Sequence, residues 1–385
     1  MSVEPGLRLW DALTDAVRDL REELSDDPMV ADDQVLAEGI RYLTRLIACG
    51  IPLTVEAMDP DFPQLVQFLS PQLNMGLPAA DCCYHWAAVD GSRSYRITGR
   101  RGSARILDIE TRRNHMSDLA GWAHVDRISD VETAPDGSFE VVLSRAEQPG
   151  NWVRLPAGPA NVMVRQYFWD WDGEQPAELH IECDGATYPP RQLTLDELRQ
   201  RVELLVGWLR RMPAACRHQV AAHYAVPADR LDVSPIDFAF GDLRYGNGHY
   251  TCGPDQAVIL EMPAPRLDYW GVQLYSHFWD GRDWHLRQTS LNGHQAAVDD
   301  DGRFRAVISH ADPGAVNWLD ASGYRRGLIC ARFYKAADLE QPTLRTVALD
   351  SLRDELPADT RWITPEQRQA VLRNRARSVR RTRRG

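Results

Sequence analysis

The chain has 385 residues, 44% apolar and 26% charged, a composition typical of a folded globular protein with room for two or three domains. Its 55 acidic and 44 basic residues give a net charge of −11, which argues against nucleic acid as a partner because phosphate contacts need basic surfaces. The only lysine, Lys335, stands in no phosphate-binding or Schiff-base motif, which excludes P-loop enzymes, protein kinases and pyridoxal enzymes.

Seven cysteines are scattered along the chain without a Cys-x-x-Cys pair, a pattern that indicates reduced thiols. The first residues lack the basic stretch and apolar run of a secretory signal. No apolar segment approaches the roughly 18 residues that a membrane helix needs. We therefore expect a cytoplasmic protein that does not contact membranes. The sequence identifies no cofactor.

Residues 1–78 are predicted to form a helical N-terminal region. Apolar residues at helical spacing predict helices over 7–24 and 32–49, and Pro63 suits the start of a short third helix. The residues expected to point inward are Leu9, Leu13, Val17, Leu20 and Leu24 in the first helix and Val35, Ile40, Leu43 and Ile47 in the second.

The pattern changes near residue 79 to short alternating runs separated by turn residues, which is typical of an antiparallel β-sandwich over 79–188. A helical linker is expected over 189–232. Thr194 and Glu197 have the spacing of a capping box at the start of its helix, and Pro213 is expected to end that helix.

A second β module over 233–350 repeats the first. An Asp-Gly turn and an Asn-Trp pair are 15 residues apart in one copy and 16 in the other, and each copy then reaches a similar triplet. The matched residues are Asp136-Gly137, Asn151-Trp152 and Arg165-Gln166-Tyr167 in the first copy, and Asp301-Gly302, Asn317-Trp318 and Arg332-Phe333-Tyr334 in the second. The fold is thus predicted to be mainly β, with two related sandwich modules joined by a helix.

The tail, residues 351–385, is predicted to contain a basic helix that begins at Thr364-Pro365. Residues 365–385 hold eight arginines and one glutamate. We expect this helix to lie on an acidic surface, within the chain or across a dimer. RNA binding is the less favoured interpretation, because no aromatic residues interleave the arginines.

The second module carries the most distinctive motifs, which are Arg244–His249, Asp268–Tyr275, Ser290–Gln295, Ser309–Gly314 and Asn317–Asp320. In these residues the chain resembles the bacterial family known as domain of unknown function 1214, in its cytoplasmic actinobacterial form. The resemblance covers about 240–335 well, and the repeat extends it to the first module. It implies a jelly-roll-like sandwich and brings no reaction with it.

One candidate site combines His294, His310 and Asp312 with Asn292. His310 and Asp312 share one strand face, where imidazole and carboxylate suit a metal or a general base with its orienting acid. Alternatively, they cap backbone amides at the turn that follows. The first copy has other residues at the matching places, so the fold itself does not require this pair.

The duplicated Asn-Trp pair, Asn317 and Trp318 in the second module, is interpreted mainly as a turn former and a core residue, with ligand contact as the alternative. Asp320 follows the pair only in the second copy. In the stretch after Asp268, Val272 and Leu274 lie on one strand face, so Trp270, Gln273 and Tyr275 cannot all point inward, and some of them should line a groove or an interface.

We therefore expect the protein to bind a small, partly apolar organic molecule in an aromatic-lined cleft of the second module. If it also transforms that molecule, His310 or His294 would be the base, with Asp312 or Asp320 as its partner. An alternative is a non-catalytic interaction protein that forms a homodimer through its Trp-rich sheet. A third hypothesis is a carbohydrate-active sandwich, for which Asp312 and Asp320 are the one carboxylate pair available.

Overall fold

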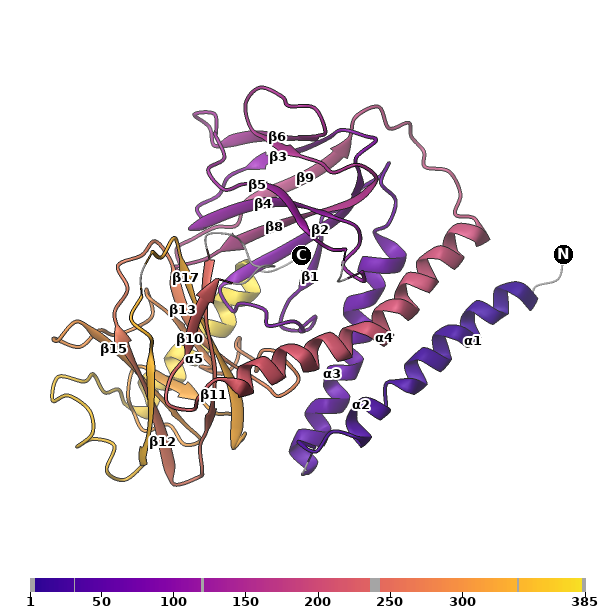
Figure 1. Ribbon diagram of the computed structural model, residues 1–385. Helices are drawn as coiled ribbons and strands as arrows, with labels where there is room; N and C mark the ends of the chain where they lie inside the picture. Colours follow the sequence, from indigo (N-terminus) through magenta and orange to yellow (C-terminus); the bar gives the residue numbers. More distant parts are fainter. Residues whose placement is uncertain (1–3, 31, 119–120, 236–242, 338, 383–385) are drawn as a thin grey trace.

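The computed structural model describes residues 4–30, 32–118, 121–235, 243–337 and 339–382 (Figure 1). The protein is mainly β, as predicted. Helices of the N-terminal region lie beside two β modules, a long helix runs from one module to the other, and a last helix lies near the C-terminus. Parts of the predicted second module and tail, 236–242 and 383–385, lie outside the described residues.

The N-terminal helices are α1 (Glu4–Asp19), α2 (Glu22–Ser25) and α3 (Asp33–Ile51), in agreement with the two helices predicted there. Asp32 caps α3 by accepting a hydrogen bond from the backbone N–H of Val35. Of the residues predicted to point inward from α3, Val35, Leu43 and Ile47 pack against the core, whereas Ile40 is 53% exposed. The buried residues of α3 include Tyr42, Leu46 and Cys49.

No helix begins at Pro63, so that prediction was wrong. Instead, a π-helical turn, η1 (Pro52–Glu56), extends α3, and the strand β1 (Val66–Leu69) follows. β1 pairs antiparallel with β2 (Cys82–Asp90), so the chain after the proline is held extended by sheet hydrogen bonds. Tertiary pairing decides the conformation of a segment this short.

The first module consists of two sheets. The five-stranded sheet has the order β1-β2-β8-β4-β5, and the four-stranded sheet has the order β7-β6-β3-β9. The remaining strands are β3 (Tyr95–Arg100), β4 (Ile106–Arg113), β5 (His124–Ile128), β6 (Ser138–Ser144), β7 (Trp152–Arg154), β8 (Pro159–Tyr167) and β9 (Glu178–Cys183).

The second module repeats this plan strand for strand. Its sheets have the orders β10-β11-β17-β13-β14 and β16-β15-β12-β18, so each strand has its counterpart nine strands earlier. The strands are β10 (Asp232–Pro235), β11 (Leu243–Thr251), β12 (Gln256–Pro263), β13 (Trp270–Tyr275), β14 (Ser290–Asn292), β15 (Arg303–Ser309), β16 (Trp318–Asp320), β17 (Arg326–Tyr334) and β18 (Thr343–Ala348). The predicted internal repeat is confirmed, although β6–β7 and β15–β16 are parallel pairs within otherwise antiparallel sheets.

The central strands β8 and β17 are covered on both faces. In β8, Val162 and Val164 point into the sandwich, whereas Met163 and Tyr167 belong to the core beneath the helices. Because successive side chains of a strand point to opposite faces, Arg165 also lies on the helix side. The same alternation places Arg332 of β17 on the outer face of the second five-stranded sheet.

The connecting helix α4 (Leu195–Ala225) is longer than predicted. The predicted capping box is present, because Thr194 and Glu197 each hydrogen-bond the other's backbone N–H. Pro213 lies inside the helix instead of ending it. A proline here removes one helical hydrogen bond. Buried residues before and after Pro213, including Trp208 and Cys216, pack into the shared core and stabilise the helix beyond the proline.

The C-terminal helix α5 (Pro365–Thr382) was predicted at this place, but it is docked more deeply than a helix on an acidic surface. Arg368 and Arg375 are 3% and 5% exposed, and Val379 is buried beside them. Arg368 forms an ion pair of 2.9 Å with Asp312 of the second module, and Asp172 of the first module accepts hydrogen bonds from α5. The helix therefore connects both modules.

No helix within the described residues is long and apolar enough to cross a membrane. All seven cysteines fall in the described part of the chain, where they are buried and no disulfide joins them.

Candidate functional site

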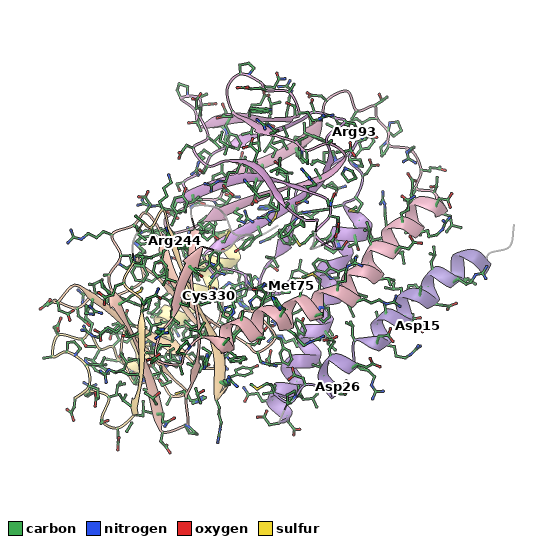
Figure 2. All side chains as sticks on the ribbon, in the orientation of Figure 1. Asp15, Asp26, Met75, Arg93, Arg244 and Cys330 are labelled. Carbon is green, nitrogen blue, oxygen red and sulfur yellow. The ribbon has the colours of Figure 1, made fainter. Side chains whose placement is uncertain are left out.

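A cavity of about 410 Å³ lies between the two modules and beneath α4. Figure 2 shows Met75, one of its lining residues, in the angle between the modules and α4. The two five-stranded sheets and α4 supply most of the remaining wall. Most of the lining residues are aromatic, methionine or leucine side chains, which include Phe68, Leu69, Leu77, Met116, Trp122, Met163, Met212 and Trp279.

The repeat brings the same pair of side chains to this cavity twice. Tyr84 of β2 is opposite Arg165 of β8 in the first module. Tyr245 of β11 is opposite Arg332 of β17 in the second. All four residues line the cavity. Two arginines that occupy equivalent places in the two repeats thus share one site.

The first of these arginines is neutralised by the protein. Arg165 is ion-paired with Glu110 and lies 3.4 Å from a carboxylate oxygen of Asp108. Glu110 also contacts Arg112 Nε at 2.7 Å. Burial raises the pKa of Asp108 to about 7, whereas the pKa of Glu110 is held far below its usual range by Arg165, His124 and Arg112 despite its burial. This cluster is a closed network of charges.

The second arginine has a different environment. Arg332 is 4% exposed and donates hydrogen bonds to Tyr275 Oη at 2.7 Å and to the Leu77 carbonyl at 2.5 Å. Both acceptors are neutral. Among the described residues, no carboxylate lies within the 4.0 Å that defines an ion pair with Arg332.

Strand register explains the difference between the two arginines. Asp108 is paired with Arg165 between β4 and β8, and the corresponding partner of Arg332 between β13 and β17 is Gly271. Glu110, two residues further along β4, corresponds to Gln273 on β13. The two carboxylates of the first module are therefore replaced by a glycine and an amide in the second.

Helix α4 contributes His223 and His218 to the cavity wall. His223 is buried, and its desolvation lowers the pKa of the imidazole, which is therefore neutral near pH 7. His218 is exposed and marks the solvent side of the cavity. Gln219 lies between them and adds an amide to the wall.

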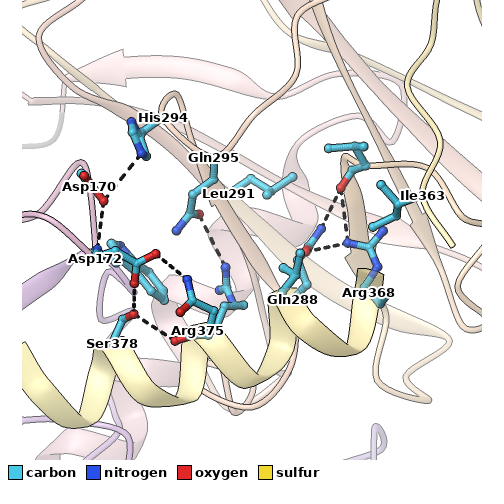
Figure 3. A pocket seen from close by; sticks show the side chains of 14 residues that line it. Asp170, Asp172, Gln288, Leu291, His294, Gln295, Ile363, Arg368, Arg375 and Ser378 are labelled. Atoms are coloured by element: carbon cyan, nitrogen blue, oxygen red, sulfur yellow. Dashed lines mark hydrogen bonds and ion pairs between the residues drawn. The ribbon is translucent and has the colours of Figure 1, made fainter. Parts of the chain in front are cut away.

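A second, smaller cavity of about 210 Å³ lies between α5 and the second module (Figure 3). Its charged residues are all held by other groups of the protein. His294 faces Asp170 at 3.6 Å, and Asp172 accepts hydrogen bonds from Asn374 and Ser378. Arg368 is paired with Asp312, which lies outside the cavity lining. This arrangement fastens α5 to the body of the protein.

The predicted acid–base residues are dispersed in the structure. His294 lines the smaller cavity, with its side chain about half exposed. His310 is hydrogen-bonded to the carbonyl of Cys252 at 2.9 Å and is not among the residues that line either cavity. Asp312 accepts a hydrogen bond from the Gly314 backbone, which is the turn-capping role expected as the alternative.

Asp320 is buried and ion-paired with Arg287 at 2.8 Å. Asp320 and Asp312 are thus held by different arginines. Neither residue lines the cavity between the modules.

The predicted ligand residues on β13 and β14 are buried. Trp270 packs edge-on against Phe304 within the second sandwich. Gln273 accepts a hydrogen bond from the Ala80 backbone at 2.7 Å. Asn292 donates to Asp81 at 2.9 Å and holds the junction between the modules. Of these predicted residues, Tyr275 is the one that binds Arg332 directly.

Asn317 and Trp318 have the same roles as their counterparts in the first module. Asn317 bonds the backbone of Ala297 and Arg305, as Asn151 bonds the backbone of Glu132 and Glu140. The indole N–H groups of Trp318 and Trp152 donate to Ser309 and Ser144, respectively. These contacts are those of a turn former and a packed residue.

Sequence reasoning did not identify Arg165 and Arg332 as site residues. Their signal was available, since both stand in the repeated triplets Arg165–Tyr167 and Arg332–Tyr334 that aligned the two modules. For metals, the described residues include no group of three or more His, Cys, Asp or Glu side chains that could hold an ion.

The family described as "Protein of unknown function (DUF1214)" matches residues 86–168 and 248–338, one segment in each module. The structure is similar to the crystal structure of an uncharacterized protein from Burkholderia cenocepacia, with a TM-score of 0.86 and 28% identity over 91% of this chain and 100% of that one. A protein from Vibrio parahaemolyticus gives a TM-score of 0.49 at 12% identity over 86% of this chain and 100% of that one. No functionally curated protein matches the chain.

Proposed function

We propose that this chain, which carries the DUF1214 domain in two segments, binds a small, partly apolar organic molecule in the cavity between its modules. The observation that carries the proposal is the cavity itself, about 410 Å³ with aromatic and methionine walls and a few polar groups. Cavities that bind small organic ligands have this size and this combination of apolar walls and placed polar groups.

The position of the cavity supports binding there more than in the cleft expected within the second module. Both modules and α4 contribute side chains, and sites at the junction of domains are common places for ligands. Four methionines line the wall, and their flexible thioethers adapt to ligands of different shape. None of the predicted residues His294, His310, Asp312 and Asp320 lines this cavity, so the proposed activity is binding alone.

The homodimer hypothesis receives less support. It required the aromatic stretch of the second module to be exposed, but Trp270 and Trp284 are 3% and 2% exposed and Tyr275 is fully buried. A dimer formed through these side chains would first have to open the core of the module.

The test uses N-phenylnaphthylamine, an uncharged fluorophore whose emission rises in apolar surroundings. We expect the protein to bind it saturably, and Ala215→Trp, which puts a large ring on α4 at the cavity wall, to weaken this binding at least tenfold. Ala222→Trp is the matched control. It makes the same change on an exposed part of the same helix and should leave binding unchanged.

Equal binding by both variants and the wild-type protein would overturn the proposal, because the probe would then lie elsewhere. Circular dichroism of each variant checks that α4 and the sheets remain folded.

A further inference from the structure

The guanidinium of Arg332 is an unusual group in the wall of an apolar cavity. Moving a charged group out of water costs several kcal/mol unless an opposite charge or a full set of hydrogen bonds compensates it. Arg332 has five N–H donors, and its hydrogen bonds to Tyr275 and Leu77 go to a phenol and a carbonyl. Its Nε is buried without a hydrogen-bond partner among the described residues.

The titratable groups that the structure describes around Arg332 do not supply a negative charge. Burial raises the pKa of Tyr275, Tyr245 and Tyr84 above the usual range of a phenol, and it raises the pKa of the Cys330 thiol in the same way. All four groups are therefore neutral near pH 7.

The buried carboxylate on this face of the sheet is occupied by other partners. Asp81 lies over Gly271, where a Cβ atom would come within 3.0 Å of its Oδ2. It accepts hydrogen bonds from Tyr269, Trp171 and Asn292 at 2.7–2.9 Å. Asp81 therefore fastens the junction of the modules and forms no ion pair with Arg332 within 4.0 Å.

The comparison with the first module shows what is absent. At Arg165 the same strand position is neutralised by the carboxylate of Glu110 from the neighbouring strand, with Asp108 beside it. At Arg332 the register places Gly271 and Gln273 there instead. Among the described residues, the cavity thus contains one arginine with a carboxylate partner and one without, which leaves one positive charge on its wall that they do not compensate.

We propose that the ligand is an organic monoanion, a carboxylate on an apolar body, and that Arg332 binds its charged group. This inference rests on the proposed binding function and specifies its ligand class. A guanidinium matches the two oxygens of a carboxylate in geometry and charge. The methionine and aromatic walls then cover the apolar body, and one uncompensated charge fits a monoanion better than a phosphate dianion.

The test compares two compounds of the same shape, naphthylacetate and its neutral amide, by displacement of N-phenylnaphthylamine. We expect the carboxylate to displace the fluorophore from the wild-type protein at a concentration at least tenfold lower than the amide. Inorganic phosphate, the second probe, should not displace it. Equal potency of the two naphthyl compounds would overturn the monoanion proposal, as would displacement by phosphate at the concentration at which the carboxylate acts.

Substitution of Arg332 then tests whether this residue causes the preference for the carboxylate. In Arg332→Met the preference for the carboxylate should disappear while binding of the fluorophore and the amide stays within threefold, and Arg332→Lys should keep part of the preference. Arg282→Met is the matched control, since Arg282 is also buried in the second module and hydrogen-bonds Tyr250 and Ala321, but does not line the cavity. It should preserve the preference.

A converse variant supplies the charge from the protein. Gln273→Glu places a carboxylate at the position that corresponds to Glu110, with almost no change of shape. The carboxylate oxygen replaces Nε2 of Gln273, which has no hydrogen-bond partner among the described residues, so the substitution breaks no hydrogen bond of that atom. We expect Gln273→Glu to weaken the binding of naphthylacetate at least tenfold and to leave the binding of the amide unchanged. An unchanged carboxylate affinity in both Gln273→Glu and Arg332→Met would overturn the inference.

The outcomes separate the two proposals. If the fluorophore is lost in Ala215→Trp but the carboxylate has no advantage over the amide, the cavity binds neutral molecules and only the monoanion inference fails. If Ala215→Trp has no effect on the fluorophore, the binding function itself fails.

Discussion

The two modules share a strand order, an Asn-Trp turn and a Tyr–Arg pair, but they differ in the charges around the arginine. In the first module, the carboxylate of Glu110 on the neighbouring strand neutralises Arg165, with Asp108 beside it. In the second, Arg332 is held by neutral oxygens. Equivalent residues of a repeat can therefore have different roles, one in the structure and one at a site.

The difference depends on two strand positions. Asp108 and Glu110 in β4 correspond to Gly271 and Gln273 in β13. Loss of both carboxylates leaves the scaffold intact, because the backbone pairing is the same, yet it changes the net charge at one wall of the cavity. Substitutions in the two modules can test whether this contrast holds in the protein.

The largest effect is expected for Arg165→Met. Removal of this guanidinium leaves Asp108 and Glu110 buried with less compensation, and breaking a buried ion pair from one side costs about 3–5 kcal/mol. Urea denaturation measures the free energy of unfolding. Arg96→Met, at an exposed position of the same module, is the control and should remain close to wild type. A loss below about 1 kcal/mol in Arg165→Met would show that the network is not structural.

Loss of the turn asparagine should affect the modules unequally. Asn317 is 7% exposed and makes three hydrogen bonds to the backbone, so Asn317→Ala should cost about 2–3 kcal/mol. Asn151 makes the equivalent bonds in a more exposed setting, and Asn151→Ala should cost about 1 kcal/mol. Thermal unfolding of both variants gives the comparison. Equal losses of stability in the two variants would mean that burial does not determine how much these hydrogen bonds contribute.

The surroundings of Arg165 should also carry a pH dependence that the described surroundings of Arg332 lack. Burial raises the pKa of Asp108 to about 7, so the folded protein holds a proton that the unfolded chain releases near pH 4. The contribution of Asp108 to stability is therefore full below about pH 4 and is lost as the pH rises through about 7. Asp108→Asn removes this loss of stability, because the amide does not ionise.

Relative to wild type, Asp108→Asn should therefore gain about 2–3 kcal/mol in unfolding free energy between about pH 5 and about pH 8. Urea denaturation at both pH values measures it. Parallel pH profiles of the two proteins would show that Asp108 is ionised throughout this range.

The smallest effect is expected for Arg332→Met without ligand. Arg332 is a buried cation without a charged partner among the described residues. Replacing it by an apolar side chain of similar length removes a desolvation cost along with its hydrogen bonds, so stability should stay within about 1 kcal/mol of wild type. Calorimetric unfolding of Arg332→Met and Arg165→Met compares their losses of stability. A loss as large as that of Arg165→Met would remove the contrast between the modules.

Much of the fold could be predicted from local patterns. The repeat was visible because turn residues recur at nearly equal spacing, and α4 was visible from its capping box at Thr194. Errors arose where packing overrides local preference. Pro213 stays inside α4, and the segment after Pro63 pairs as β1 instead of forming a helix.

The candidate site was harder to predict. Sequence reasoning selected residues that occur in only one copy, such as His310 and Asp320, but these are bound by local partners. The duplicated residues Arg165 and Arg332 were used to align the modules, although their importance lies in the neighbours that register gives them. Those neighbours stand on other strands, far away in the chain.

By itself, the sequence determined that this protein is mainly β, that its two modules are copies of one plan, and that Asn-Trp closes a turn in each. These features depend on residues near one another in the chain. Only the tertiary structure decided that the outer faces of the two five-stranded sheets meet under α4, and that a balanced and an unbalanced arginine share the resulting cavity. Alternation along a strand predicts which side chains share a face, but only the packing of whole sheets determines what that face meets.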